Sequence, residues 1–278
     1  MATQPVIKWT GSKRSQSAEI IKHFPVSFNT YYEPFIGGGS MMRRLIDERM
    51  FRDFDRIECS DLNGDLINLW NMIKESPDKV AEHYKALWTE MNSTNDIESK
   101  KQYFNRIRER YNRERNPLDF MFIMRTCTNG MPRYNRNSEF NNTFHCTRDG
   151  INPETLEEII YDWSNELNYN NVMFYHRSYD EIKPGKDDFC YFDPPYAATK
   201  QIYFSNFDTD RFFEFLRGLD CKWVLSYDGI SGDVDNTYAV PEDLYDEHLY
   251  IKSGNSSFKR TIGKNSDAIV YESLYIKY

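Results

Sequence analysis

The chain has 278 residues, of which 40% are hydrophobic, and this is enough for one large domain or for a core domain with an insertion. Its formal net charge of −8 argues against a surface that binds polyanions throughout. The five cysteines are odd in number and lack zinc-finger spacing, so we expect neither a disulfide framework nor a metal site. The sequence shows no signal-peptide pattern and no apolar run of membrane-spanning length, which predicts a protein of the cytoplasm.

The first sixty residues predict the opening units of an α/β sheet. The expected elements are, in order, a helix over 14–23, a strand over 31–36, a glycine turn over 37–40, a helix over 41–49 and a strand over 56–60. Asp61 directly follows the second strand.

The middle of the chain predicts helices and one long turn-rich segment. Apolar spacing indicates helices over 63–74, 79–91, 98–115, 118–126 and 152–167. The segment 128–144 is rich in Asn, Gly and Pro and is expected to be a loop. Strands return over 172–175, 189–192, 222–226 and 267–277, the last as one strand or a pair, with a helix over 209–219. This alternation predicts a doubly wound sheet of residues 1–63 and 164–278, interrupted by a helical insert over 64–163.

Two features near the first strands indicate a nucleoside site. The turn Gly37-Gly38-Gly39-Ser40 lets the backbone pass close to a ligand, and the helix after it can face an anion, although a plain tight turn is the alternative. The absence of GxGxxG disfavours a nicotinamide oxidoreductase. Asp61 stands where a carboxylate can accept both hydroxyls of a ribose. The pair fits a nucleoside without a pyrophosphate, such as S-adenosyl-L-methionine.

The stretch Asp193-Pro194-Pro195-Tyr196 follows the apolar strand 189–192. Two consecutive prolines cannot continue a ladder, so the strand must stop and present Asp193 at its carboxyl edge. The carboxylate and a backbone carbonyl could accept both N–H groups of an exocyclic amine, which would turn its lone pair toward a methyl group, while the aromatic ring stacks on the base. Such a base must leave the duplex first. A structural turn with a solvated acid is the alternative.

Basic residues are concentrated in the middle of this acidic chain. Between Lys100 and Arg148 there are 11 Lys/Arg against 4 Asp/Glu, which indicates a local anionic partner. Arg106, Arg110 and Arg113 recur at helical spacing and could contact phosphates. A solvated, salt-bridged helix face would give the same pattern.

Four blocks occur in a fixed order: Lys8-Trp9-Thr10-Gly11-Ser12-Lys13, Glu33-Pro34-Phe35-Ile36-Gly37-Gly38-Gly39-Ser40, Asn129-Gly130-Met131-Pro132-Arg133-Tyr134-Asn135 and Asp193-Pro194-Pro195-Tyr196. Over nearly the whole chain this order resembles the Dam-type family of DNA adenine methyltransferases, the alpha group. The resemblance implies a Rossmann-like class I methyltransferase sheet with a mostly helical target-recognition insert.

The resemblance also implies site residues. For the cofactor they are Trp9, Lys13, Glu33, Phe35, Gly37, Gly39, Ser40, Asp61, Leu62, Ser178, Tyr179 and Asp193, and the catalytic stretch is Asp193, Pro194, Pro195 and Tyr196. Where the family usually places an acid beside the adenine of the cofactor, this chain has Ser178, or the acid is displaced to Asp180.

For DNA the implied or candidate contacts are Asn129, Arg133, Asn135, Arg106, Arg110, Arg113, Lys259 and Arg260. Arg133 matches the arginine that reads a guanine in relatives, in line with the bidentate pairing of arginine with that base. Thr128 and Pro132 depart from the family pattern, so the target sequence is expected to differ from GATC.

The sequence therefore predicts a site-specific DNA adenine methyltransferase that uses S-adenosyl-L-methionine and acts on a flipped adenine in double-stranded DNA. A cytosine-N4 or RNA adenine methyltransferase and a catalytically inactive relative are the alternatives. Cytosine-amine enzymes more often carry Ser in place of Asp193, which favours adenine. We expect a monomer or weak dimer from a bacterial or phage-infected cell. The recognition sequence and a cognate restriction endonuclease stay open.

Overall fold

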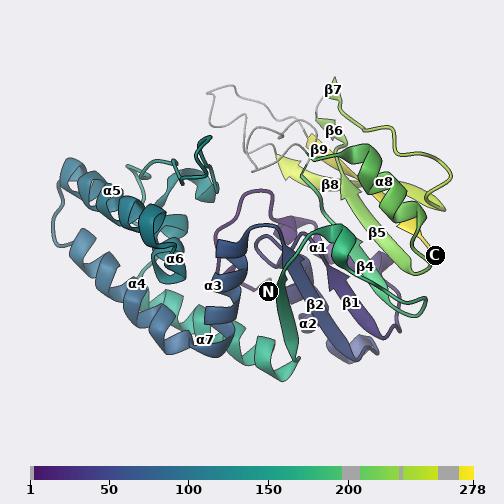
Figure 1. Cartoon of the computed structure of the whole chain (residues 1–278), viewed down its shortest axis with the longest axis horizontal. Helices are drawn as coiled ribbons and strands as arrows, with labels where there is room; N and C mark the ends of the chain where they lie inside the picture. Colours follow the sequence, from purple (N-terminus) through teal and green to yellow (C-terminus); the bar gives the residue numbers. More distant parts are fainter. Residues whose placement is uncertain (1–2, 196–206, 232–233, 256–268) are drawn as a thin grey trace.

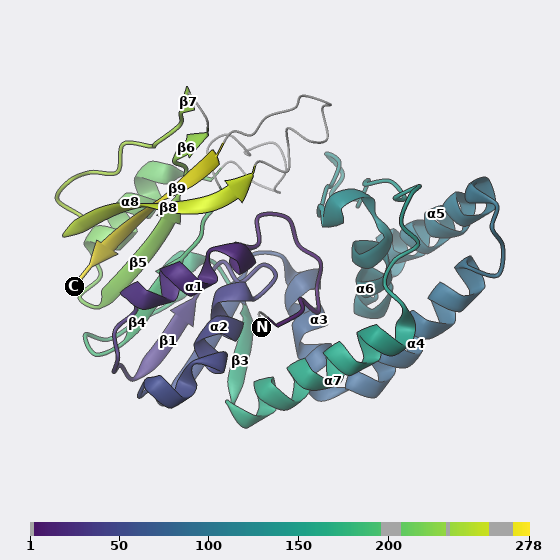
Figure 2. The same ribbon diagram turned by 180° about the vertical axis from the view of Figure 1, so that it is seen from behind.

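The computed structural model describes residues 3–195, 207–231, 234–255 and 269–278. These residues form a mixed α/β fold in which a sheet lies beside a mainly helical region (Figure 1). Figure 2 shows from behind that the N-terminal segment runs between the two parts. The Rossmann-like class I fold expected from the sequence is confirmed.

The described part of the chain contains a sheet of nine strands. Its parallel half has the order β3-β2-β1-β4-β5, made of β1 Thr30–Glu33, β2 Arg56–Asp61, β3 Val172–His176, β4 Phe189–Phe192 and β5 Lys222–Tyr227. The antiparallel strands are β6 Ile230–Ser231, β7 Val234–Asp235, β8 Glu247–Asn255 and β9 Ile269–Lys277, with β9 between β5 and β8. The strand order reverses between β1 and β4, which is where open α/β sheets bind ligands.

Helices accompany the sheet and fill the segment between β2 and β3. Beside the sheet lie α1 Ser17–Ile20, α2 Ser40–Asp47 and α8 Thr209–Arg217. Between β2 and β3 the chain forms α3 Gly64–Glu75, α4 Pro77–Met91, α5 Ile97–Glu114, α6 Pro117–Thr126 and α7 Pro153–Tyr169. Asn116 and Asn152 accept hydrogen bonds at the starts of α6 and α7, each before a proline; Asn152 was the cap expected from the sequence.

The sheet is covered on both faces. Side chains of β4 alternate, so that Phe189 and Tyr191 join the core shared with α1 to α7, whereas Cys190 and Phe192 join the core under α8. Both faces of a parallel strand are buried in this arrangement, which explains why β4 reads as a continuous apolar run.

Helix α3 joins the helical region to the sheet. Its Trp70 stacks on Phe174 of β3 with ring centroids 5.3 Å apart, and lies at the same distance from Trp163 of α7. The helical region therefore shares the core of the sheet. The division of the chain at 63/64 and 163/164 stays a prediction.

One expectation about secondary structure is wrong, and one strand was not expected. The continuous helix over 14–23 is instead α1 between two 3-10 turns, Lys13–Ser15 and Ile21–His23. The carbonyl of Ile21 accepts the backbone N–H of Phe24 at 3.1 Å and a hydrogen bond from Arg52 at 2.7 Å. Pro25, at the α-helical donor position, has no N–H, so the segment ends in a 3-10 turn. Strand β8 has no counterpart among the expected elements, whereas the described part of the last expected strand is one strand, β9, from Ile269 onward.

None of the helices in the described ranges combines the length and the apolar character that crossing a bilayer requires.

Candidate active site

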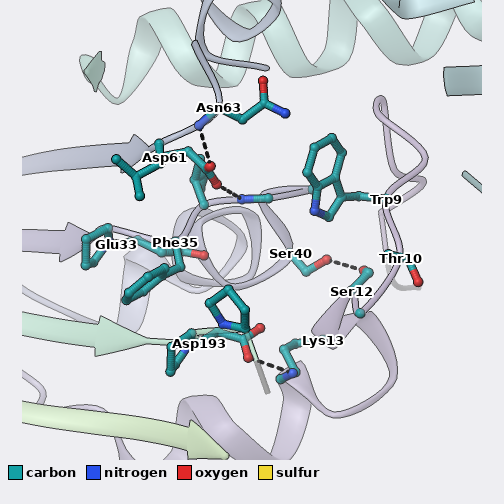
Figure 3. Close-up of a pocket in the computed structure, with 18 of the residues that line it drawn as sticks. Trp9, Thr10, Ser12, Lys13, Glu33, Phe35, Ser40, Asp61, Asn63 and Asp193 are labelled. Carbon is teal, nitrogen blue, oxygen red and sulfur yellow. Dashed lines mark hydrogen bonds and ion pairs between the residues drawn. The ribbon is translucent and has the colours of Figure 1, made fainter. Parts of the chain in front are cut away.

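A cavity opens at the carboxyl ends of β1, β2 and β4, where the strand order reverses (Figure 3). Of the residues expected to bind the cofactor, those that line it are Trp9, Lys13, Glu33, Phe35, Gly37, Ser40, Asp61, Leu62, Tyr179 and Asp193. Pro194 and Pro195 line it beside Asp193. These residues come from five separate stretches of sequence, 9–13, 33–40, 61–62, 179 and 193–195, which the fold brings together around one cavity.

Asp61 lies at the end of β2 and is held by two backbone groups. Its Oδ1 accepts the N–H of Asn63 at 2.9 Å, and its Oδ2 accepts the N–H of Gly37 at 3.3 Å. Burial raises the pKa of Asp61 to about 6, against the lowering effect of these two hydrogen bonds. The carboxylate is therefore fixed beside the glycine turn and faces the cavity.

The glycine turn packs against Trp9 of the N-terminal segment. Gly37 has a φ of +46°, and a Cβ there would lie 3.0 Å from the Trp9 ring. Gly39 has a φ of +68°, and its Cβ would come within 2.9 Å of Trp70. Gly39 does not line the cavity, so in this structure it allows the turn to pack on α3.

Lys13 pairs with the acid that ends β4. Its Nζ lies 2.8 Å from Asp193 Oδ1 and 3.4 Å from Glu272 Oε2, and its side chain is only 4% exposed. Burial disfavours the ammonium, but the charges of Asp193 and Glu272 outweigh it and raise the pKa of Lys13 above the ordinary lysine value. Lys13 thus stays charged beside Asp193.

Glu33 is a second carboxyl group at this edge, at the end of β1. Burial raises its pKa to about 8, although the Tyr31 hydroxyl donates to Glu33 Oε2 at 2.8 Å and opposes the shift; the charge of Asp193 raises it further. Glu33 is therefore mostly protonated at neutral pH, while Lys13 is charged. Close by, the hydroxyls of Ser12 and Ser40 lie 2.6 Å apart and join the N-terminal segment to the start of α2.

Aromatic rings form the wall at the other end of the cavity. Phe35 stacks on Tyr179 with centroids 5.7 Å apart and meets Phe207 edge-on at 5.9 Å. Ser178, expected to contact the cofactor, instead caps the 3-10 turn Tyr179–Glu181 and does not line the cavity. Asp180, the alternative acid, is paired with Arg211.

The cavity also contains residues that the motifs did not single out for this role. They are Thr10, Gly11, Ser12, Asn63, Pro132, Tyr134 and Tyr191, among others. The side-chain amide of Asn63 donates to the Tyr134 hydroxyl at 3.2 Å. Pro132 and Tyr134 flank Arg133, so the expected DNA-reading segment reaches the cavity wall. Asn63 lies close to Asp61 in the sequence, and Pro132 and Tyr134 lie next to Arg133. This closeness to predicted site residues was the sequence signal that could have identified these three.

The turn-rich segment folds into a hairpin-like loop, the hairpin 127–144. Isolated bridges join Cys127 to Phe144 and Tyr134 to Phe140. Arg133 is exposed on it, and no hydrogen bond or ion pair of its side chain is present among the described residues. Asn129 is exposed with a φ of +58°, and Asn135 donates to Glu139 at 2.8 Å within the loop.

One face of α5 holds the hairpin 127–144. Arg108 donates to the carbonyl of Asn142 at 3.0 Å, and Asn112 donates to that of Phe140 at 3.1 Å. Just past the helix end, Arg115 donates to Ser138 O at 2.5 Å. These contacts place the basic helix beside the hairpin through side chains that the sequence did not single out.

The predicted arginine stripe lies elsewhere on α5. At about 100° per residue, Arg106, Arg110 and Arg113 are centred roughly 160° around the helix from the hairpin-holding face. Arg110 forms two hydrogen bonds with the fully buried carboxylate of Asp119, whereas Arg106 and Arg113 are each 68% exposed. Of the three arginines, one therefore forms a structural ion pair and the other two face solvent.

Three predicted site residues, Tyr196, Lys259 and Arg260, lie outside the described residues.

Comparison with known proteins gives a consistent family. Residues 9–258 match the family described as D12 class N6 adenine-specific DNA methyltransferase. The chain is 28% identical over 252 residues to the type II methyltransferase M.MjaIII of Methanocaldococcus jannaschii, covering 81% of this chain and 84% of that protein. It is 32% identical over 192 residues to the DNA adenine methylase of Serratia marcescens, covering 69% and 66%.

Among solved structures, the rRNA methyltransferase aviRa from Streptomyces viridochromogenes aligns with a TM-score of 0.41 and 11% identity, covering 100% of this chain and 86% of that one.

Proposed function

The chain belongs to the D12 class of N6 adenine-specific DNA methyltransferases, and on that premise we propose that it transfers a methyl group from S-adenosyl-L-methionine to the N6 amine of an adenine rotated out of double-stranded DNA. The observation that carries the proposal is that Asp61 and Asp193 line one cavity at the point where the strand order reverses. Asp61 could then bind the ribose of the cofactor while Asp193 orients the amine of an adenine placed in the same cavity.

The cavity residues fit S-adenosyl-L-methionine. When bound, this group supplies a methyl carbon made electrophilic by its sulfonium. Asp61, fixed by Gly37 and Asn63, would accept hydrogen bonds from the ribose hydroxyls. Trp9 packs closely on the glycine turn, and Gly37 and Gly38 line the cavity beside it without a side chain that would obstruct a ligand. Phe35 and Tyr179 offer an aromatic wall for the adenine ring.

The target amine would be oriented by the end of β4. The carboxylate of Asp193 accepts one N–H and the carbonyl of Pro194 accepts the other, so the lone pair of the nitrogen is drawn out of conjugation with the ring. Pro194 and Pro195 hold this backbone stiff. Catalysis is then positioning and electrostatics without a covalent enzyme intermediate. Tyr196 keeps its predicted role as a stacking surface for the base.

DNA would be read by the hairpin 127–144. Arg133 is exposed there, between two residues of the cavity wall, which supports its prediction as a guanine-reading side chain. Arg106 and Arg113 remain candidates for phosphate contact, but they lie on the far side of α5 from the hairpin. The helical insert, a cognate restriction endonuclease and a monomer or weak dimer stay predictions from the sequence.

Transfer of labelled methyl groups tests the proposal. The purified protein is incubated with methyl-labelled S-adenosyl-L-methionine and genomic DNA that lacks adenine methylation, and the product is digested to nucleosides. We expect label in N6-methyladenine, with long-read sequencing giving the recognition sequence. Label in N4-methylcytosine, transfer to RNA but not DNA, or no transfer at all would contradict the proposal.

A further inference from the structure

The ion pair of Lys13 and Asp193 belongs to a largely buried group of three charged side chains. The Lys13 ammonium stands between two carboxylates, Asp193 Oδ1 at 2.8 Å and Glu272 Oε2 at 3.4 Å. The two acids lie 79 positions apart in the sequence, since Asp193 follows β4 and Glu272 belongs to β9. Their side chains are 19% and 16% exposed, so water screens the three charges only weakly.

Glu272 is itself held in place. Its Oε1 accepts a hydrogen bond from Ser253 of β8 at 3.2 Å, and Ser253 accepts one from Gln16, which is only 3% exposed, at 2.6 Å. Its Oε2 is buried and makes no hydrogen bond among the described residues. This oxygen instead forms the ion pair with Lys13. A buried carboxylate oxygen without such a bond is costly unless a charge compensates it.

A lysine between two acids differs from a simple ion pair. With Asp193 alone, the whole ammonium charge would act on one carboxylate and weaken it as a hydrogen-bond acceptor for the target amine. With Glu272 on the other side, the ammonium is shared, and Asp193 keeps its acceptor strength while it stays fixed in position. We propose that Glu272 is a positioning residue for Asp193 that acts through Lys13. This inference rests on the proposed function, because the role of Asp193 as acceptor belongs to it.

The first test replaces Glu272 by its uncharged isostere. We expect E272Q to lower kcat for methyl transfer to DNA about tenfold, while KM for DNA and the affinity for S-adenosyl-L-homocysteine, measured by calorimetry, change less than about twofold. E272D keeps the charge and should recover part of kcat. Thermal unfolding by circular dichroism confirms that each variant is folded.

The matched control is E247Q, which removes the same charge from the same β8–β9 pair. Glu247 lies four residues along β8 from the partner of Glu272, about 13 Å away along the strand. Its carboxylate accepts a hydrogen bond from the Tyr278 hydroxyl at the C-terminus, not from the cavity. We expect E247Q to keep the parent kcat within about twofold.

A double-mutant cycle tests the route through Lys13. In a K13M background, E272Q should cost no further activity, because the charge that Glu272 holds is gone. An undiminished kcat in E272Q, an equal loss in E247Q, or the same loss with and without Lys13 would each overturn the inference. Absence of methyl transfer to adenine by the parent enzyme would instead overturn the proposed function, and the inference with it.

Discussion

The sheet edge and the helical region use charged side chains in opposite ways. At the sheet edge, Asp61, Asp193 and Lys13 line a cavity, and Lys13 meets acids from distant parts of the chain. In the helical region, Arg108 and Arg110 are engaged in internal contacts. Arg106 and Arg113, which face solvent, form ion pairs only at 3.8 and 3.9 Å.

The difference follows from how the two kinds of element direct side chains. Parallel strands all end at one edge, so a polar residue directly after a strand must arrive at the same place as its neighbours. A helix presents side chains in every direction, so spacing shows which residues share a face but not what that face meets. Predictions about strand ends should therefore hold better than predictions about helix faces, and the following changes test this.

The largest effect is expected at the sheet edge. Replacing Asp193 by Ala removes the acceptor that orients the amine, and we expect methyl transfer to fall at least about 10³-fold while S-adenosyl-L-homocysteine still binds. The control is D243A, which removes an acid that pairs with Arg217 and does not line the cavity. Its turnover should stay within about twofold of the parent. Near-normal turnover by D193A would refute the mechanism.

The second effect concerns stability of the helical region. Asp119 is fully buried and accepts hydrogen bonds from Arg110 on one side, while His83 Nε2 lies 2.7 Å from it on the other. Removing one partner of a buried ion pair leaves an uncompensated charge, so D119A should lower the free energy of unfolding by about 3 kcal/mol.

Denaturant unfolding measures this loss, and R106A is the matched surface change. Arg106 is 68% exposed, with a 3.8 Å pairing to Glu90, so its loss should cost less than about 0.5 kcal/mol. Equal losses of unfolding free energy in D119A and R106A would contradict the distinction between a structural ion pair at Arg110 and a surface side chain at Arg106.

The third effect separates the hairpin from the far face of α5. We expect R133A to reduce discrimination at one base pair by about 2 kcal/mol, because a bidentate contact to a base edge is lost. R113A removes an equally basic, exposed side chain on the opposite side of α5 and should leave discrimination unchanged. Methylation of a duplex library read by long-read sequencing compares them. A uniform loss on all duplexes in R133A would assign Arg133 to phosphate contact.

The smallest effect is a pH dependence of cofactor binding. Because burial raises the pKa of Asp61 to about 6, lowering the pH through this value protonates the carboxylate and weakens its acceptance of ribose hydroxyls. Affinity for S-adenosyl-L-homocysteine should fall about tenfold between pH 7 and pH 5. Glu33, with a pKa raised to about 8, stays protonated over this range and does not contribute.

Calorimetry with D61N completes this test. The amide does not titrate, so the variant should bind weakly at pH 7 and lose little more at pH 5. A parent enzyme with constant affinity from pH 7 to pH 5 would remove Asp61 from the ribose site.

Much of the fold was predictable from local patterns. The parallel strands, the capped helices α6 and α7 and the glycine turn follow from apolar periodicity, Asn-Pro starts and positive-φ glycines. Strand β8 was missed although His248, Tyr250 and Lys252 alternate with Leu249 and Ile251, because an antiparallel strand at the end of a sheet carries only this weak period-two signal.

The sequence by itself determined which residues end the strands, and hence that Asp61 and Asp193 lie at one edge. Only the tertiary structure decided which charged side chains meet at this edge and which form contacts elsewhere in the molecule. Lys13 faces both Asp193 and Glu272, which are 79 positions apart in the chain, and Arg110 turns to Asp119 while Arg108 reaches the hairpin. Local sequence sets backbone geometry, but a charge partner depends on chain segments that only the folded core brings together.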